Sequence, residues 1–318
     1  MSRDNYQNVD GLLVPKIFSA ESVREALNYK PCPEDVFIVS YPKCGTTWIR
    51  HIVYHIFSRG QPPEDPEDFE CRSPFFELRG QDAIDRLRRP GAIVTHMPFN
   101  KQPYSPEAKY IYITRNPYDC CVSFYYHLRM MPTVGQDVGT FDDFLEGIFK
   151  GDIVFELYFV HVLSWYPHRH DPNVLFLTYE GLKKDVRASI QKIADFLGKD
   201  DGDELRRDPT VLERIVELTS FKHMQKAVNP MMRKFSESFS CSESVESMPM
   251  WMQRINRASQ GVIKKPAQEG GNFVRKGKVG DWREHFSGEQ ARKMKEYIEN
   301  NTAGSDVMSL WKDINFDY

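Results

Sequence analysis

Short runs of apolar residues, many of them β-branched or aromatic, recur along the chain between polar, proline-containing or glycine-containing stretches. They cover residues 36–41, 92–95, 109–114 and 173–178. Short apolar runs without polar alternation are typical of strands buried on both faces of a parallel sheet. We therefore expect a core strand at each position, and we expect residues 36–41 to be the first ordered element.

Between these runs, apolar residues recur at the spacing of amphipathic helices. One helix should open at Arg115, Asn116 and Pro117, because Asn116 is a suitable N-cap and proline is tolerated at the first helical position. Gly198 should end another helix, at residues 186–197. The remaining helical segments are residues 46–57, 141–149 and 154–166. Strands that alternate with helices predict an α/β fold, with a parallel sheet flanked by helices. Since no repeat or linker divides the chain, we expect a single domain over residues 1–318.

Two stretches carry no clear periodicity. Residues 60–73 read as a polar, proline-rich loop. Residues 229–271 are rich in Met, Ser and charge, and a segment of that length is usually a lid, a binding segment or disordered. Its methionines either line an adaptable apolar pocket or simply cover the core. They are Met231, Met232, Met248, Met250 and Met252.

Composition excludes several classes of protein. The chain is 41% hydrophobic and 27% charged, which excludes general disorder. A net charge of only −3 provides no global basic field for nucleic acid or anionic lipid. No stretch approaches the ~20 apolar residues of a transmembrane helix, and the N-terminal residues do not resemble a signal peptide. We therefore expect a cytoplasmic protein with no nucleic-acid or membrane partner.

Cysteine and histidine spacing gives no sign of a metal site. The six cysteines form no CxxC pair, and in a reducing compartment they are better interpreted as buried or free thiols than as disulfides. His51 and His55 are four residues apart, but no glutamate follows His51 as a zinc-site motif would require. We expect no metal.

The most informative motif is the octet from Tyr41 to Trp48, YPKCGTTW, between a predicted strand and a predicted helix. A helix N-terminus there offers unpaired N–H groups to an anion, Gly45 lets the backbone come close to a phosphate, and Lys43 adds a cation. It is not a Walker A loop, because the lysine precedes the glycine. The alternative is an ordinary strand–helix turn with an exposed lysine.

The octet resembles the 5′-phosphosulfate loop, YPKSGTTW, of the cytosolic sulfotransferases, and the resemblance extends over nearly the whole chain. It implies a cofactor, 3′-phosphoadenosine 5′-phosphosulfate (PAPS), whose product is 3′,5′-adenosine bisphosphate (PAP). It also implies that a P-loop-like phosphosulfate-binding loop follows the first core strand. The loop residues that would bind the cofactor are Lys43, Cys44, Gly45, Thr46, Thr47 and Trp48.

Further segments resemble other nucleotide-binding parts of the family. In YITRNPYDCCVS, Arg115 and Ser123 match the residues that hold the 3′-phosphate, and a guanidinium suits a phosphate well. The alternative for Arg115 is a helix cap or a surface ion pair. The resemblance places Phe221 and Trp48 on the two faces of the adenine. The remaining matches are Tyr179, Thr219, Ser220, Met224, Phe273, Val274, Arg275, Lys276 and Gly277, the last five in a segment that resembles RKGxxGDW.

The resemblance also implies the reaction, transfer of a sulfuryl group to a hydroxyl of a small, largely apolar acceptor. His96, in IVTHMPF, matches the family's KTHxP element and would be the general base, a role that suits a pKa near neutrality. Lys43 would stabilise charge on the leaving phosphate, and Ser123 would hold Lys43 until the acceptor binds. Phe75 matches a pocket-wall aromatic, which implies a phenol, catecholamine or steroid as the acceptor.

The chain departs from the family pattern at several positions. Cys44 replaces a serine, and a thiol beside Lys43 is expected to be prone to oxidation. Val94 stands where the family often has a lysine. Residues 283–292 match the family's dimer motif poorly, so a homodimer is possible but in doubt. The connection between Phe221 and Phe273 is longer than usual, so acceptor choice should be distinctive.

Three other functions remain as alternatives. A P-loop kinase would require a Gly-Lys-Thr order and an aspartate for magnesium, and the sequence supplies neither convincingly. A catalytically silent sensor of PAP is compatible with the departures at Cys44 and Val94. A membrane-tethered carbohydrate sulfotransferase would need an N-terminal anchor.

Overall fold

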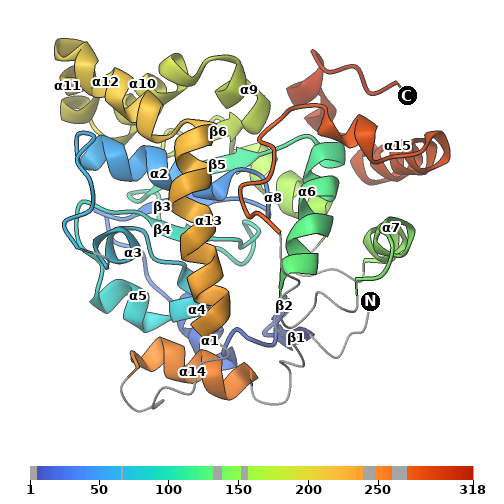
Figure 1. The fold of residues 1–318 in the computed structure, drawn as a ribbon, viewed down its shortest axis with the longest axis horizontal. Helices are drawn as coiled ribbons and strands as arrows, with labels where there is room; N and C mark the ends of the chain where they lie inside the picture. Colours follow the sequence, from blue (N-terminus) through green and yellow to red (C-terminus); the bar gives the residue numbers. More distant parts are fainter. Residues whose placement is uncertain are drawn as a thin grey trace.

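A computed structural model describes residues 6–65, 67–131, 138–151, 157–238, 248–259 and 271–317. Within them lies a four-stranded parallel sheet in the order β4-β3-β5-β6 (Figure 1). The strands are β3 (Val36–Val39), β4 (Ile93–Thr95), β5 (Lys109–Thr114) and β6 (Val174–Thr178). Each predicted core strand is confirmed, although β3 ends two residues earlier than expected and β4 and β6 each begin one residue later. The α/β fold class is confirmed.

The sheet is buried on both faces because alternate strand residues pack against different helices. Phe37, Tyr110 and Tyr112 belong to one hydrophobic cluster, and Ile38 and Ile111 belong to the other. The second cluster is completed by α2 (Thr46–Phe57), α10 (Val186–Leu197) and α12 (Pro209–Leu218). The first includes α6 (Pro117–Met130), α8 (Tyr158–Trp165) and α15 (Gly288–Thr302). Burial on both faces explains why the strands read as continuous apolar runs.

The predicted helices are largely confirmed. Residues 46–57 and 186–197 form helices with those bounds, and α7 (Phe141–Lys150) extends one residue beyond its prediction. The Asn116 side chain accepts a hydrogen bond from the Asp119 N–H at 2.9 Å and caps α6, with Pro117 at its first position. The predicted helix at 154–166 is observed as α8, and residues 154–156 lie outside the described residues.

The expectation that the first ordered element is at residue 36 is wrong. A hairpin of β1 (Tyr6–Val9) and β2 (Leu12–Pro15) precedes it, followed by α1 (Ala20–Leu27). Asp10 and Gly11 turn the chain with positive φ angles of 49° and 85°, and the Asn8 side chain accepts a hydrogen bond from the Gly11 N–H. Asp-Gly is a recognised hairpin signal, but strands of four residues give too weak a pattern to stand out.

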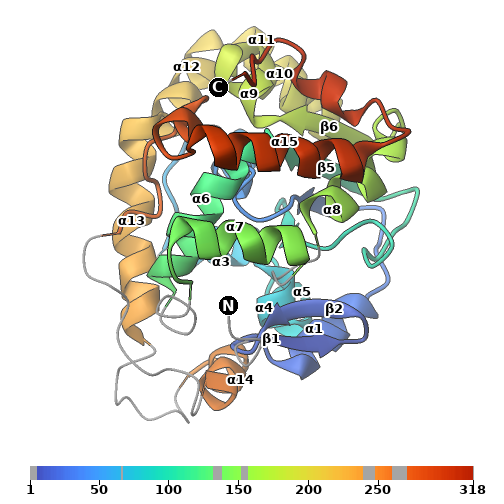
Figure 2. The same cartoon turned by 90° about the vertical axis from the view of Figure 1, so that its right-hand side faces the viewer.

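Both stretches expected to be irregular contain helices. The proline-rich loop at 60–73 includes α3 (Asp68–Arg72). The segment 229–271 contains the end of α13 (Phe221–Ser238) and all of α14 (Met250–Ser259), while residues 239–247 and 260–270 lie outside the described residues. Helix α13 continues through Pro230 and runs along one side of the molecule towards α14, which lies beside α1 (Figures 1 and 2). Tertiary packing along α13 overrides the weak helical periodicity of its sequence.

The other elements complete the layers around the sheet. They are α4 (Phe76–Arg79), α5 (Gln81–Asp85), η2 (Tyr166–His168), α9 (Tyr179–Lys184), α11 (Lys199–Arg207), η4 (Asp281–Glu284) and η5 (Val307–Trp311). Among the helices of the described ranges, none combines the length and the apolar character needed to cross a bilayer.

Candidate active site

Four of the predicted site residues lie immediately beyond the carboxyl ends of the four core strands. Lys43 follows β3, His96 follows β4, Arg115 follows β5 and Tyr179 follows β6. The next strand along the chain, β4, pairs with one edge of β3, and the strand after it, β5, pairs with the other edge, so the strand order reverses at β3. A crevice at such a reversal is where open α/β sheets bind ligands. A cavity of about 650 Å³ lies at this edge and is lined by all four residues.

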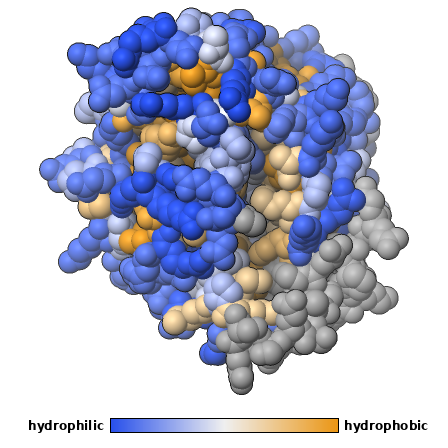
Figure 3. Space-filling view, turned by 60° about the vertical axis from the view of Figure 1, so that its left-hand side comes forward, coloured by the Kyte–Doolittle hydropathy of each residue, from blue (hydrophilic) through white to orange (hydrophobic). Residues whose placement is uncertain are grey.

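Nearly every residue predicted from the motifs reaches this cavity. Figure 3 shows a hollow with hydrophobic residues in its walls and hydrophilic residues around it. Two predicted residues, Cys44 and Ser220, do not line the cavity. Those that do are Lys43, Gly45, Thr46, Thr47, Trp48, Phe75, His96, Arg115, Ser123, Tyr179, Thr219, Phe221, Met224, Phe273, Val274, Arg275, Lys276 and Gly277.

The loop after β3 has a strained, tightly packed backbone. Lys43 and Gly45 adopt positive φ angles of 70° and 114°. A Cβ atom at Gly45 would lie 3.0 Å from a Tyr179 ring carbon and 3.1 Å from the Ile113 side chain. Glycine is therefore needed both for its conformation and for the close approach of the loop to β5 and to Tyr179 at the start of α9.

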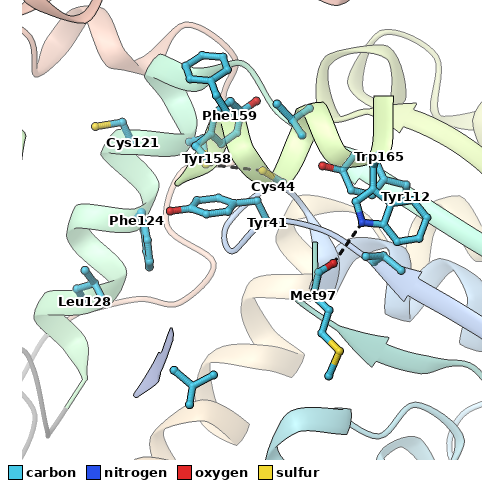
Figure 4. Close-up of a cluster of buried hydrophobic side chains, with 14 of the residues drawn as sticks. Tyr41, Cys44, Met97, Tyr112, Cys121, Phe124, Leu128, Tyr158, Phe159 and Trp165 are labelled. Atoms are coloured by element: carbon cyan, nitrogen blue, oxygen red, sulfur yellow. Dashed lines mark hydrogen bonds between the residues drawn. The ribbon is translucent and has the colours of Figure 1, made fainter. Parts of the chain in front are cut away.

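Cys44 points away from the cavity into the core. Its side chain lies among buried aromatic rings that include Tyr41 and Tyr158 (Figure 4), and its Sγ is 3.6 Å from that of Cys120. Burial raises the pKa of the Cys44 thiol well above its usual value. The expectation of an oxidation-prone thiol is therefore wrong, because reactivity requires an exposed thiolate. The described cysteines are all free.

Lys43 lies in the cavity wall beside other cations. Its Nζ is 3.8 Å from the centre of the Phe273 ring, and no hydrogen bond joins it to Ser123 in the described structure. The pKa of Lys43 is lowered to about 7, chiefly by burial and in part by the nearby positive charges of Arg115 and Arg275. Three like charges that converge in a buried cavity favour an anionic ligand.

Arg115 is held in place with part of its guanidinium unsatisfied. One terminal nitrogen donates to the Lys278 carbonyl at 3.0 Å and lies 3.8 Å from the Asp119 carboxylate, and the group stacks 4.4 Å over Tyr179. Its Nε is buried without a hydrogen-bond partner in the described part of the chain, and so is Nε1 of Trp48. Buried donors of this kind are normally paired, so both side chains of the cavity wall have an unmet hydrogen-bonding requirement.

The segment after residue 271 closes one side of the cavity. Arg275 and Lys276 both donate to the buried Asp281 carboxylate, and Lys276 also bonds Glu284. The guanidinium of Arg275 lies 4.6 Å over the Tyr126 ring. The acidic partners thus hold both predicted clamp cations in this structure.

Helix α13 fixes the backbone of the same segment. The Asn229 side chain accepts a hydrogen bond from the Val274 N–H at 2.8 Å, and Gln225 donates to the Val274 carbonyl at 3.2 Å. At Gly277, where φ is 59°, a Cβ atom would lie only 2.6 Å from the Phe221 ring. Asn229 and Gln225 could not be predicted from the sequence, since no local pattern distinguishes them from other polar helical residues.

The polar groups near the predicted adenine site have local partners. The Thr219 hydroxyl donates to the Ile215 carbonyl at 2.7 Å, and the Ser220 hydroxyl accepts from the His223 N–H at 3.4 Å. Trp48 makes an edge contact with Tyr179 at 5.5 Å. Phe221 remains 37% exposed, which leaves its ring accessible from the cavity.

His96 is oriented by hydrogen bonds from three neighbouring elements. Its ring Nδ1 lies 2.7 Å from the Ser40 carbonyl. Its backbone N–H donates to Glu77 Oε1 at 2.6 Å, and its backbone carbonyl accepts from His161 Nε2 at 3.1 Å. An Nδ1–H donor to Ser40 makes Nε2 the basic nitrogen. Burial lowers the pKa of His96 to about 4, so the ring is neutral at physiological pH.

Ser40 and Glu77 connect this histidine to its surroundings and were missed from the sequence. The Ser40 hydroxyl lies 2.6 Å from that of Thr46, which links His96 through Ser40 to the loop after β3. Glu77 accepts from both the His96 N–H and the Thr95 hydroxyl, and burial raises the pKa of its carboxyl to about 7. Their importance comes from contacts between separate strands and helices, which residue type and spacing do not reveal.

The opposite half of the cavity is mostly apolar. Phe75 makes edge contacts with His96 at 5.0 Å and with Phe18 at 5.8 Å. Of the five methionines considered in the sequence, Met231, Met232 and Met252 line the cavity. Met248 and Met250 do not, so the pocket-lining interpretation holds for three of the five.

No three His, Cys, Asp or Glu side chains within the described ranges are grouped so that they could hold a metal ion.

Comparison with known proteins identifies the class of enzyme. The model of the sulfotransferase domain matches residues 33–248 and 243–306, which together cover well over half of the chain. The chain therefore belongs to the sulfotransferase family and is a sulfotransferase enzyme.

Individual relatives match over almost their whole length. Sulfotransferase 1E1 of Bos taurus is 30% identical over 314 residues, which cover 96% of this chain and 95% of the relative. A 3-alpha-hydroxysteroid sulfotransferase of Cavia porcellus is 30% identical over 311 residues, with coverages of 95% and 96%. The crystal structure of mouse sulfotransferase SULT7A1 complexed with PAP superposes with a TM-score of 0.68 at 29% identity, covering 97% of this chain and 99% of that one.

Proposed function

We propose that this enzyme transfers the sulfuryl group of PAPS to a hydroxyl of a small, largely apolar acceptor, with His96 as the general base. One observation carries the proposal. The phosphate-binding loop, Arg115 and a neutral, oriented histidine line one cavity at the carboxyl edge of the sheet. A relative that shares this fold was crystallised with PAP, which supports the choice of cofactor.

The residues of the cavity suit a nucleotide that carries phosphate at both ends. Lys43 and the amides around Gly45 would hold the 5′ end, and Arg115, Ser123 and Arg275 would hold the 3′-phosphate. The partnerless donors on Arg115 and Trp48, and the mutual repulsion of the cations, are features that a polyanion would relieve. Phe221 and Trp48 offer aromatic surfaces for the base.

PAPS, once bound, supplies a sulfuryl group on a phosphate leaving group. His96 Nε2 takes the proton from the acceptor hydroxyl, because Nδ1 is occupied by Ser40. Lys43 provides positive charge beside the leaving oxygen. Lys43 and His96 both line the cavity, so one bound PAPS can have its leaving oxygen beside Lys43 and the acceptor hydroxyl beside His96, as an in-line displacement requires.

The acceptor is proposed to be a phenol, catecholamine or steroid. Phe18, Phe75 and the methionines of α13 and α14 provide a flat, apolar and adaptable surface for such a molecule. The similarity to a 3-alpha-hydroxysteroid sulfotransferase supports this range.

The test separates chemistry from nucleotide binding. We expect His96→Ala to abolish transfer of labelled sulfate from PAPS while the dissociation constant for PAP, measured by calorimetry, stays within about threefold of the wild-type value. Arg275→Ala should instead weaken PAP binding by ~1.5–3 kcal/mol. If the wild-type protein bound neither PAPS nor PAP, the proposal would fail. Binding without transfer to any hydroxyl would favour a nucleotide sensor.

A further inference from the structure

Helix α6 presents a continuous stripe of residues to the cavity. Ser123 and His127 are spaced four apart and therefore lie on one face of the helix, and Met131 is the residue that follows its last turn. All three line the cavity, with His127 in the middle of this stripe.

The contacts of His127 place it beside the reacting groups. Its ring meets the Phe273 ring edge-to-face at 5.5 Å, and Phe273 carries the Lys43 Nζ on its face at 3.8 Å. The ring also lies 6.4 Å from Phe124 in a stacked arrangement. Lys43 is close enough for its charge to act on His127.

The Nδ1 atom of His127 is buried and has no hydrogen-bond partner within the described part of the chain. Several other polar side chains of the cavity wall are paired with one another. Arg50 and Arg79 share Glu70, and Arg86 pairs with Glu67. His127 is thus a half-buried side chain with one buried, unpaired ring nitrogen, and a ligand that supplied a partner would relieve an unfavourable state of the folded protein.

The imidazole is neutral under ordinary conditions. Burial lowers the pKa of His127 well below its usual value, and the nearby positive charge of Lys43 acts in the same direction. A neutral ring does not attract an anion, and it can donate or accept a hydrogen bond according to its tautomer. A hydroxyl group can pair with either tautomer.

We propose that His127 is a specificity-determining residue that hydrogen-bonds a second hydroxyl of the acceptor, close to the hydroxyl that is sulfated. The inference rests on the proposed function, because it places the acceptor in the same cavity. It narrows the acceptor class to diols in which the two hydroxyls are neighbours, of which catechol is the simplest aromatic example.

The test compares catechol with phenol in two proteins, the wild type and His127→Phe. Phenylalanine keeps a planar ring between Phe124 and Phe273 but removes both ring nitrogens. Because catechol has two equivalent hydroxyls, its kcat/KM is first divided by two. We then expect the ratio of kcat/KM for catechol to that for phenol to be about ten in the wild type. In the variant the ratio should fall towards one. His127→Asn should restore part of it.

Met131→Leu is the matched control, since it alters the same stripe without changing a polar group. This substitution should change the kcat/KM values for catechol and for phenol by the same factor. A wild-type ratio near one, or a ratio that His127→Phe leaves unchanged, would overturn the proposal.

Binding measurements separate this proposal from the proposed function. Calorimetric titration of catechol and of phenol into the complex of the protein with PAP requires no turnover. Tighter binding of catechol that His127→Phe removes would support the role of His127 even if neither compound were sulfated. Equal affinities in the wild type would contradict it even if both compounds were sulfated.

Discussion

At the scale of single residues, the site depends on ionisable groups whose burial changes their ordinary behaviour. Burial brings the pKa of Lys43 down to about 7 and that of His96 to about 4. The histidine is therefore neutral across the physiological range, as its proposed role of general base requires. The lysine loses part of its charge when no anion is present, and a bound phosphate would restore it.

This behaviour predicts that PAP binding takes up a proton. A group whose pKa rises from about 7 on binding becomes protonated between the two values, so uptake should approach one proton near about pH 8 and vanish below about pH 6. Calorimetry in two buffers with different ionisation enthalpies measures this number. The Lys43→Met variant, which cannot titrate, should show none of this uptake, and equal uptake in both proteins would contradict the assignment.

At the scale of elements, α13 connects the two halves of the cavity. Phe221 and Met224 line it near the start of the helix, and Met231 and Met232 line it further along. Between them, Asn229 is buried and bonds the Val274 backbone in the segment that carries Arg275. The helix therefore supports the segment proposed to clamp the nucleotide and also forms part of the cavity wall.

We expect Asn229→Ala to weaken PAP binding by about 1–2 kcal/mol, because the Val274 N–H loses its partner and Arg275 is held less firmly. The dissociation constant from calorimetry is the measurement. Ala227→Ser, an exposed change on the same helix, is the control and should leave PAP binding unaltered. A loss of the same size in both variants would point to a general disturbance of α13.

At the scale of the whole molecule, residues far apart in the chain enclose the acceptor half of the cavity. Arg254 on α14 bonds Glu21 and Glu25 on α1, more than 220 residues away in sequence. Trp251, one turn earlier on α14, lines the cavity with its ring 4.5 Å from the Arg79 guanidinium. The N-terminal helix thus anchors the helix that covers the pocket.

We predict that Arg254→Met raises the KM for the acceptor several-fold while PAP affinity is unchanged, since the ion pairs anchor only α14. The free energy of unfolding should change by less than ~1 kcal/mol, because the pairs are partly exposed to solvent. Steady-state kinetics and denaturant titration measure the two effects. Arg257→Met, on the same helix, should leave the acceptor KM as it is.

The sequence by itself determined the α/β class, the four core strands and the loop around Gly45, because these depend on local signals. Apolar runs, a glycine between strand and helix, and the Asn116-Pro117 cap specify structure over a few residues. Every residue predicted from the motifs lines the cavity, except Cys44 and Ser220. A sequence motif gives a residue's position along the loop but not the direction of its side chain.

Only the tertiary structure decided the surroundings of those residues. It turned Cys44 towards Cys120, placed Ser40 and Glu77 around His96, and left the buried Nδ1 of His127 without a partner in the described chain. It also made helices of residues whose local pattern was weak. The physical reason is that burial, pKa shifts and hydrogen-bond partners arise from elements distant in sequence, and only folding brings those elements into contact.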